Sequence, residues 1–140
     1  MDNRRDFIKK TTLASTGVVV GASAFSAKSY GNIMGANDRV VLGSIGVRGR
    51  GSNLLENFSE MYNDGVHIKT VCDVDSAVLG DNVKMAAKNQ KGNKPGTEED
   101  MRRVFEDKEI DAVVVAVPNH WHALATIWAC QAGKHVYVEK

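Results

Sequence analysis

From Arg39 onward, short apolar runs rich in β-branched residues alternate with segments whose apolar residues recur every three or four positions. The apolar runs predict buried strands, because a parallel strand covered on both faces has no polar alternation. The spaced segments predict helices that each carry one apolar face. We therefore expect strands at residues 40–45, 68–72, 112–117 and 135–138, helices at residues 52–63, 76–90, 97–108 and 120–132, and a turn at residues 91–96.

Capping residues mark several of these helix ends. Ser76 is placed to cap the second helix, and Thr97 with Asp100 makes a capping-box-like start for the third. Pro118 ends the strand before the last helix, and Gly133 is placed as that helix's C-terminal cap. The charges of the third helix indicate a solvated face. The last helix is expected to face the core through Leu124, Ile127, Trp128 and Ala132.

Strands and helices that alternate with short links imply parallel pairing and right-handed crossovers. The predicted fold class is α/β, a doubly wound, Rossmann-like parallel sheet, and 140 residues suffice for one such domain. A complete sheet of this type has a sixth strand, so we expect the sequence to be truncated before its last strand.

Composition and charge narrow the function classes. Hydrophobic residues make up 43% and charged residues 25%, the ordinary balance of a soluble globular protein. The net charge is +1 and no basic stripe is present, which gives no electrostatic case for a nucleic-acid partner. Two cysteines, Cys72 and Cys130, are too few for a disulfide scaffold or a zinc cluster, and we expect both to be buried thiols.

The first 27 residues predict an export signal. A basic head is followed by a stretch without charge between Lys10 and Lys28, which is too short and too weakly apolar for a stable membrane span. Residues 3–9, NRRDFIK, resemble the twin-arginine motif, which implies export by the twin-arginine machinery to the periplasm or beyond. An ordinary secretory signal or an uncleaved anchor is the alternative. Residues 28–37 then form a linker and residues 38–140 the folded domain.

Three glycines lie between the first strand and the first helix and predict a nucleotide-binding turn. Glycines at this place permit a tight turn, a close approach of the backbone to a diphosphate, and close packing of the helix on the strand. Gly46 and Gly51 match the outer positions of G-x-G-x-x-G, but Arg48 takes the middle position and Gly49 lies next to it. Arg48 either reshapes the loop or itself reaches a phosphate oxygen. A tight turn without a ligand is the plainer alternative.

An acid follows this turn at the end of the next strand. Asp73 lies about 20 residues beyond the glycines, where a carboxylate accepts hydrogen bonds from the adenosine ribose. Such an acid repels a 2′-phosphate, so NAD is favoured and NADP is less favoured. Asp75 could share or take this role, and a simple acid at a strand end is the plainer interpretation.

Two further motifs resemble a known family. Residues 115–123, VAVPNHWHA, and residues 133–140, GKHVYVEK, are similar to the Gfo/Idh/MocA oxidoreductases. The resemblance covers residues 39–140 and implies the N-terminal NAD-binding domain of such an enzyme. The family has a second domain that supplies most substrate contacts, and we expect it to be absent from this sequence.

The resemblance implies roles for particular residues. Pro118 and Asn119 would line the cofactor, and Glu139 would hold the local geometry and contact it. Lys140 would be the active-site lysine, and His122 a second catalytic candidate near the nicotinamide or the substrate entrance. An ammonium group can polarise a substrate oxygen and stabilise developing negative charge there. A metal is not expected, because the histidine pair around Trp121 has no third ligand near it in the sequence.

The implied activity is NAD-dependent hydride transfer on a sugar or a polyol. Because free NAD is not expected outside the cytoplasm, a tightly held cofactor that is reduced and reoxidised within one cycle fits an exported enzyme. An NAD-dependent glycosidase or epimerase that oxidises its sugar transiently is the first alternative, and a non-catalytic binding protein the second. We expect residues 38–140 alone to be inactive, and the full-length enzyme to be a homo-oligomer.

Overall fold

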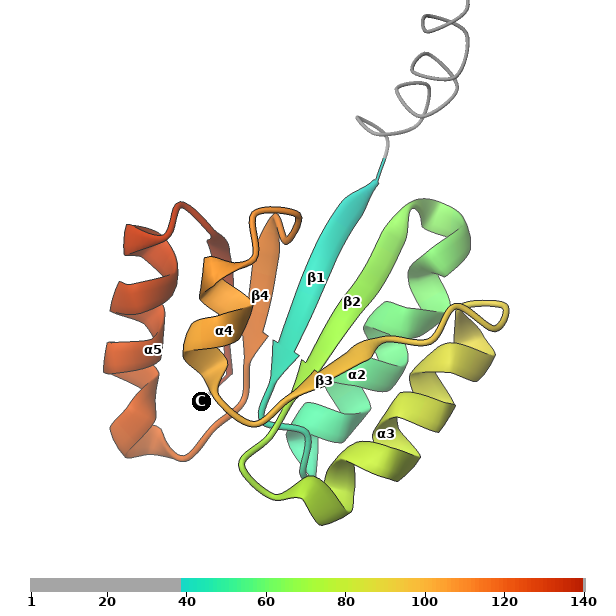
Figure 1. Cartoon of the computed structure of the whole chain (residues 1–140), viewed down its shortest axis with the longest axis horizontal. Coiled ribbons are helices and arrows are strands. Elements are labelled where there is room, and N and C mark those ends of the chain that lie inside the picture. Colours follow the sequence, from blue (N-terminus) through green and yellow to red (C-terminus); the bar gives the residue numbers. More distant parts are fainter. Residues whose placement is uncertain (1–38, 140) are drawn as a thin grey trace, which may run out of the picture. The chain divides into compact units, whose positions relative to one another are not determined.

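The computed structural model describes residues 39–139 of the chain. The predicted export signal at residues 1–27, the linker at residues 28–37 and Lys140 therefore lie outside the described residues. Within the described part, strands and helices alternate along the chain as the hydrophobic pattern predicts (Figure 1). No helix of this part has the length and apolar character needed to cross a membrane.

Five parallel strands form one sheet with the order β3-β2-β1-β4-β5. The chain moves outward from the central strand β1 in one direction through β2 and β3, and then crosses to β4 and β5 on the other side. This is the order of a doubly wound sheet, so the predicted fold class is confirmed. The strands are β1 (Val40–Ile45), β2 (Val66–Cys72), β3 (Gly96–Glu98), β4 (Ala112–Val115) and β5 (His135–Val138).

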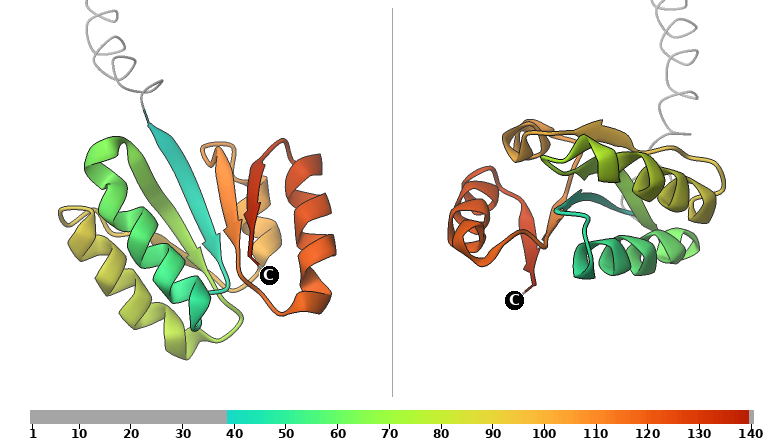
Figure 2. Two further views of the ribbon diagram at one scale, coloured as in Figure 1. Left: turned by 180° about the vertical axis from the view of Figure 1, so that it is seen from behind. Right: turned by 90° about the horizontal axis from the view of Figure 1, so that it is seen from below.

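Helices cover both faces of the sheet, as Figures 1 and 2 show. One core lies between the sheet and helices α2 and α3, where Leu55 and Val71 are fully buried. The other lies between the sheet and helices α4 and α5, where Val113 and Ala129 are fully buried. The helices are α2 (Arg50–Glu60), α3 (Ser76–Asn89), α4 (Met101–Glu106) and α5 (Asn119–Gln131), with a 3-10 turn, η1 (Met61–Asp64), after α2.

Strand β3 was missed by the sequence pattern. Thr97 does not cap a helix but pairs with Val71 of β2, in a strand of only three residues. Asp100 is the residue that caps α4, and its side chain accepts a hydrogen bond from the Arg102 backbone N–H. The predicted capping box was therefore wrong, because the ladder with β2 holds Thr97 in extended backbone.

The inward face of α5 also differs from the prediction. Ala125 and Ala129 are fully buried, whereas Leu124 and Ile127 are 37% and 53% exposed. Small residues let a helix approach a sheet closely, and in this helix they form the packed stripe. Of the predicted inward residues, only Trp128 packs against the core, since Ala132 is exposed. Cys130 is exposed too, while Cys72 is buried as expected.

Candidate functional site

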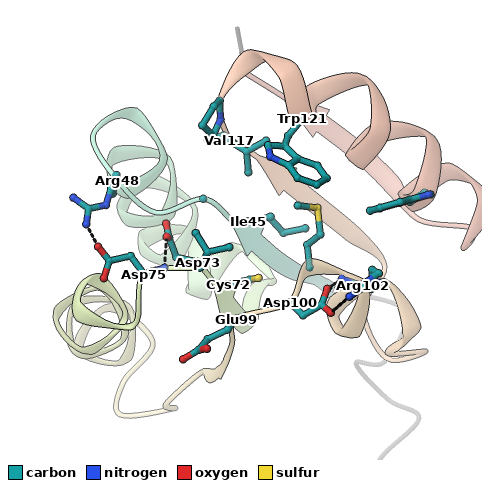
Figure 3. Close-up of a pocket in the computed structure, with 16 residues that line it drawn as sticks. Ile45, Arg48, Cys72, Asp73, Asp75, Glu99, Asp100, Arg102, Val117 and Trp121 are labelled. Carbon is teal, nitrogen blue, oxygen red and sulfur yellow. Dashed lines mark hydrogen bonds and ion pairs between the residues drawn. The ribbon is translucent and has the colours of Figure 1, made fainter.

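A pocket of about 720 Å³ opens at the carboxyl edge of the sheet (Figure 3). It lies where the connections after the neighbouring strands β1 and β4 lead to helices on opposite faces of the sheet, the place at which open α/β sheets bind ligands. The loop after β1, the loop after β2, the start of α4 and the turn into α5 all contribute to its wall. The residues that line it include Ile45, Gly46, Arg48, Cys72, Asp73, Val74, Asp75, Glu99, Asp100, Met101, Arg102, Val117, Pro118, Trp121 and Trp128.

The loop from Gly46 to Gly51 turns tightly between β1 and α2. Gly46 has a φ of 80°, and a Cβ there would lie 2.6 Å from the carbonyl oxygen of Ala116. A Cβ on Gly51 would press against the carbonyl oxygen of Gly46. The Gly46 N–H also donates to the carbonyl oxygen of Cys72 at 2.8 Å, which fixes the loop between the ends of β2 and β4. Both outer glycines are thus required by the packing.

Gly49 precedes the first turn of α2 and carries no side chain that could cap it. Its φ is 49°, and a Cβ there would meet no atom within 4 Å, so the backbone faces open space at this point. The N-terminus of a helix carries a partial positive charge and unpaired backbone N–H groups, and both attract phosphate. The loop and α2 therefore offer a site for an anion.

Asp73 stands at the end of β2 beside this loop. Its Oδ2 accepts a hydrogen bond from the Val47 N–H at 2.9 Å, and its Oδ1 accepts one from the Asp75 N–H at 3.0 Å. These bonds fix the carboxylate, which remains partly exposed in the pocket wall. Each carboxylate oxygen accepts more than one hydrogen bond, so Asp73 retains capacity for the two hydroxyls of a ribose.

Arg48 and Asp75 form an ion pair across the mouth of the pocket, next to Asp73 (Figure 3). Asp75 is also the N-cap of α3, since its Oδ1 accepts a hydrogen bond from the Ala77 N–H at 2.9 Å. The predicted cap, Ser76, is instead the first helical residue. Arg48 lines the pocket, and its guanidinium group is turned to Asp75 at the outer edge (Figure 3).

The pocket wall also contains large apolar side chains. Ile45, Met101 and Trp121 are among them, and Trp121 is 38% exposed. Cys72 lies at the base, where burial and then the charge of Asp73 raise the pKa of its thiol to about 12. The thiol is therefore neutral at physiological pH and is no nucleophile.

Sequence reasoning missed the contribution of residues 99–102 to this pocket. It interpreted their charges as a solvated helix face, whereas Glu99, Asp100 and Arg102 line the cavity. The Arg102 side chain donates to the Asp100 carboxylate and holds its pKa down at about 2. Recognition of β3 as a strand would have placed them, because residues that follow a parallel strand lie at the same edge of the sheet as the residues that follow its neighbours.

The structure brings four of the predicted site residues into the pocket wall: Gly46, Arg48, Asp73 and Pro118. Gly49 and Gly51 shape the loop behind that wall, and Gly51 is buried under it. Asn119 is the first residue of α5 and is exposed.

Three further predicted site residues do not line the pocket in the described part of the chain. His122 and Glu139 lie apart from its wall, and Lys140 is not among the described residues. The Nε2 atom of His122 lies 2.6 Å from the carbonyl oxygen of Val117, so the ring bonds back to its own turn. The carboxylate of Glu139 lies 3.4 Å from Nε of Arg50 and links the end of β5 to the start of α2. The catalytic and cofactor roles of all the predicted site residues stay predictions. Among residues 39–139, no three side chains of the metal-ligating types come together.

The glycine loop, the N-terminus of α2 and the carboxylate of Asp73 lie together at one edge of the sheet, an arrangement typical of a dinucleotide-binding domain. A family model described as "Oxidoreductase family, NAD-binding Rossmann fold" matches residues 16–140. The chain belongs to this family, the Gfo/Idh/MocA oxidoreductases, and the part described here is its NAD-binding domain.

Similar proteins agree with this assignment. A glycosyl hydrolase family 109 protein of Shewanella pealeana is 31% identical over 153 residues, which cover 98% of this chain and 33% of the relative. An alpha-N-acetylgalactosaminidase of Shewanella oneidensis is 30% identical, with coverage of 98% and 33%. The solved NAD-binding protein from Listeria innocua is 33% identical, with a TM-score of 0.56 over 74% of this chain and 27% of that chain. The chain spans about a third of the length of the curated relatives it matches.

The residues present fit NAD on structural grounds. The outer glycines leave no room for side chains, as a backbone cradle for a diphosphate requires. Asp73 is held at the end of β2 by two backbone N–H groups and lines the same pocket as Gly46. Trp121 adds an aromatic side chain to the wall of that pocket.

Proposed function

We propose that this domain holds NAD in an exported enzyme that oxidises and reduces a carbinol carbon of a sugar or polyol. The observation that carries the proposal is that Gly46, Arg48 and Asp73 line one pocket, in the loop that leads directly into the N-terminus of α2 and at the end of β2. NAD supplies a hydride acceptor when bound, and the protein contributes binding and orientation. The substrate-binding residues and the complete reaction belong to the proposal.

In this proposal, different residues of the pocket bind different parts of NAD. Gly46 and Gly49 present backbone to the diphosphate, and Asp73 accepts hydrogen bonds from the ribose. Pro118 and Trp121 position the nicotinamide end, where the turn into α5 forms the wall. By the family resemblance, Lys140 would hold the substrate hydroxyl and stabilise the negative charge that develops as its proton leaves.

The twin-arginine motif at residues 3–9 supports export of the folded protein with its cofactor in place. In a compartment without a pool of NAD, a tightly held cofactor is the form that lets the enzyme act repeatedly. We also expect the full-length protein to be a homo-oligomer, which light scattering of the purified protein would measure directly.

A net glycosidase is the second candidate, and the names of the relatives favour it. Such an enzyme oxidises the sugar, eliminates the aglycone, adds water and reduces the sugar again, so NAD is regenerated in each cycle. Oxidoreduction and glycosidase activity use the same nucleotide pocket. The two candidates therefore differ in the products and not in the cofactor site.

The test begins with the complete exported protein, denatured so that mass spectrometry can identify any released nucleotide. We expect NAD in near-stoichiometric amount, and a protein that carries none and binds none on titration would refute the proposal. An Asp81→Asn variant serves as the control, because Asp81 is exposed on α3 and remote from the pocket wall. Incubation with a chromogenic N-acetyl-α-galactosaminide then separates the candidates, since a glycosidase releases the chromophore with no net change in NADH absorbance.

A further inference from the structure

The mouth of the pocket places an arginine and an acid, paired with each other, beside the carboxylate of Asp73 (Figure 3). Oδ2 of Asp73 contacts the backbone N–H of Val47, the residue before Arg48. Oδ1 of Asp73 contacts the backbone N–H of Asp75. The guanidinium of Arg48 and the carboxylate of Asp75 pair with each other directly beside this group.

Asp73 and Arg48 favour different cofactors. In dinucleotide-binding folds an acid after the second strand selects the 2′-hydroxyl of NAD, whereas a nearby arginine accommodates the 2′-phosphate of NADP. The pocket contains both elements, Asp73 and Arg48. Which of them dominates depends on whether the guanidinium is free to meet a phosphate.

In this structure the guanidinium of Arg48 is paired with Asp75 and is therefore not free. We propose that the Arg48–Asp75 ion pair sets the cofactor choice: Asp75 holds Arg48 away from the 2′-position and thereby makes the pocket select NAD over NADP. This inference rests on the proposed function. It assigns to Arg48 a latent role as a ligand of the 2′-phosphate, and to Asp75 a role in specificity beyond capping α3.

The charge of the pocket wall supports this assignment. Four acids and two arginines line the pocket, and each arginine pairs with one of the acids. Asp73 and Glu99 form no ion pair with an arginine of the wall, so a 2′-phosphate meets uncompensated negative charge. The side chains of Arg48 and Asp75 are 64% and 39% exposed. Removal of the Asp75 charge takes away the partner of Arg48 and also one negative charge of the pocket wall, and both changes favour a 2′-phosphate.

Asp75→Asn isolates the charge, because asparagine caps a helix as well as aspartate does. The experiment is isothermal titration of the complete protein, freed of nucleotide, with NAD and with NADP. We expect Asp75→Asn to raise the affinity for NADP relative to NAD by about tenfold or more, as a new charge-assisted contact does. Asp75→Ser, which also retains a capping oxygen, should show the same direction, and Asp81→Asn should leave the ratio unchanged.

A second substitution shows whether Arg48 carries the effect. In Arg48→Ala with Asp75→Asn the gain in NADP affinity relative to NAD should disappear, with Arg48→Ala alone as the reference for both nucleotides. An unchanged ratio in Asp75→Asn, or a gain that persists without Arg48, would overturn the inference. An equal loss of NAD and NADP affinity in Arg48→Ala would also overturn it, because the arginine would then bind the diphosphate. Failure of the unmodified protein to bind either nucleotide would instead refute the proposed function.

Discussion

Individual residues at the β1–α2 turn are fixed by contacts on all sides, and Gly51 shows this most directly. A methyl group there would press against the Gly46 carbonyl and lie 3.2 Å from the Cβ of Ala116. We expect Gly51→Ala to destabilise the protein by about 1–3 kcal/mol and to weaken NAD binding, because the loop must shift. Urea unfolding and NAD titration measure both effects.

Gly80→Ala is the matched control for this prediction. Gly80 lies within α3, where an added Cβ meets no atom within 4 Å. Alanine in a helix interior is favoured over glycine by about 0.5–1 kcal/mol, so this variant should be slightly more stable. If Gly51→Ala were as stable as Gly80→Ala and bound NAD equally well, the loop would not be the tight cradle described here.

Among the elements, α3 is joined to the edge of β2 by the buried side chain of Gln90, which follows the last residue of that helix. The amide of Gln90 is fully buried, accepts a hydrogen bond from the Ile68 N–H at 2.6 Å and donates to the Ile68 carbonyl at 3.1 Å. The β3 ladder starts only at Thr70, so Gln90 satisfies the strand edge before it.

Gln90→Leu keeps the approximate volume and removes these bonds. We expect a loss of about 1–3 kcal/mol in the free energy of unfolding, because the Ile68 backbone groups are left buried and unpaired. Lys88→Leu, at an exposed position of the same helix, should change stability by less than about 0.5 kcal/mol. Equal stability of the two variants would show that other groups satisfy the edge of β2.

The elements also show how far the sequence could predict the fold. The runs in β1 and β4 are long and rich in β-branched residues, so their pattern identified them as buried strands. Strand β3 has three residues and no pattern of its own, and only pairing with β2 makes it a strand. Helix α5 is apolar on most sides, so periodicity could not select the alanine stripe that packs on the sheet.

The same limit applies to the candidate site. The spacing of the glycines and of Asp73 follows from local chain geometry, and the sequence predicted those positions. The pairing of Arg48 with Asp75 joins residues 27 positions apart through the arrangement of two loops, which local patterns do not encode. The contribution of Glu99 and Arg102 depended on β3 and was missed with it.

At the scale of the whole molecule, the doubly wound order places the ends of β1, β2 and β4 at one edge, and the pocket follows from this topology. The chain supplies the nucleotide pocket and spans about a third of the length of its curated relatives. The central claim is therefore that this edge binds NAD in a defined orientation.

A crystal structure of the protein with NAD tests this claim most directly. We expect the diphosphate to lie against the loop 46–51 at the N-terminus of α2, with the adenosine ribose hydroxyls within hydrogen-bonding distance of the Asp73 carboxylate. The nicotinamide should lie toward Pro118 and Trp121. A pocket that stays empty at saturating NAD, or a nucleotide bound without contact to the loop and Asp73, would contradict the account.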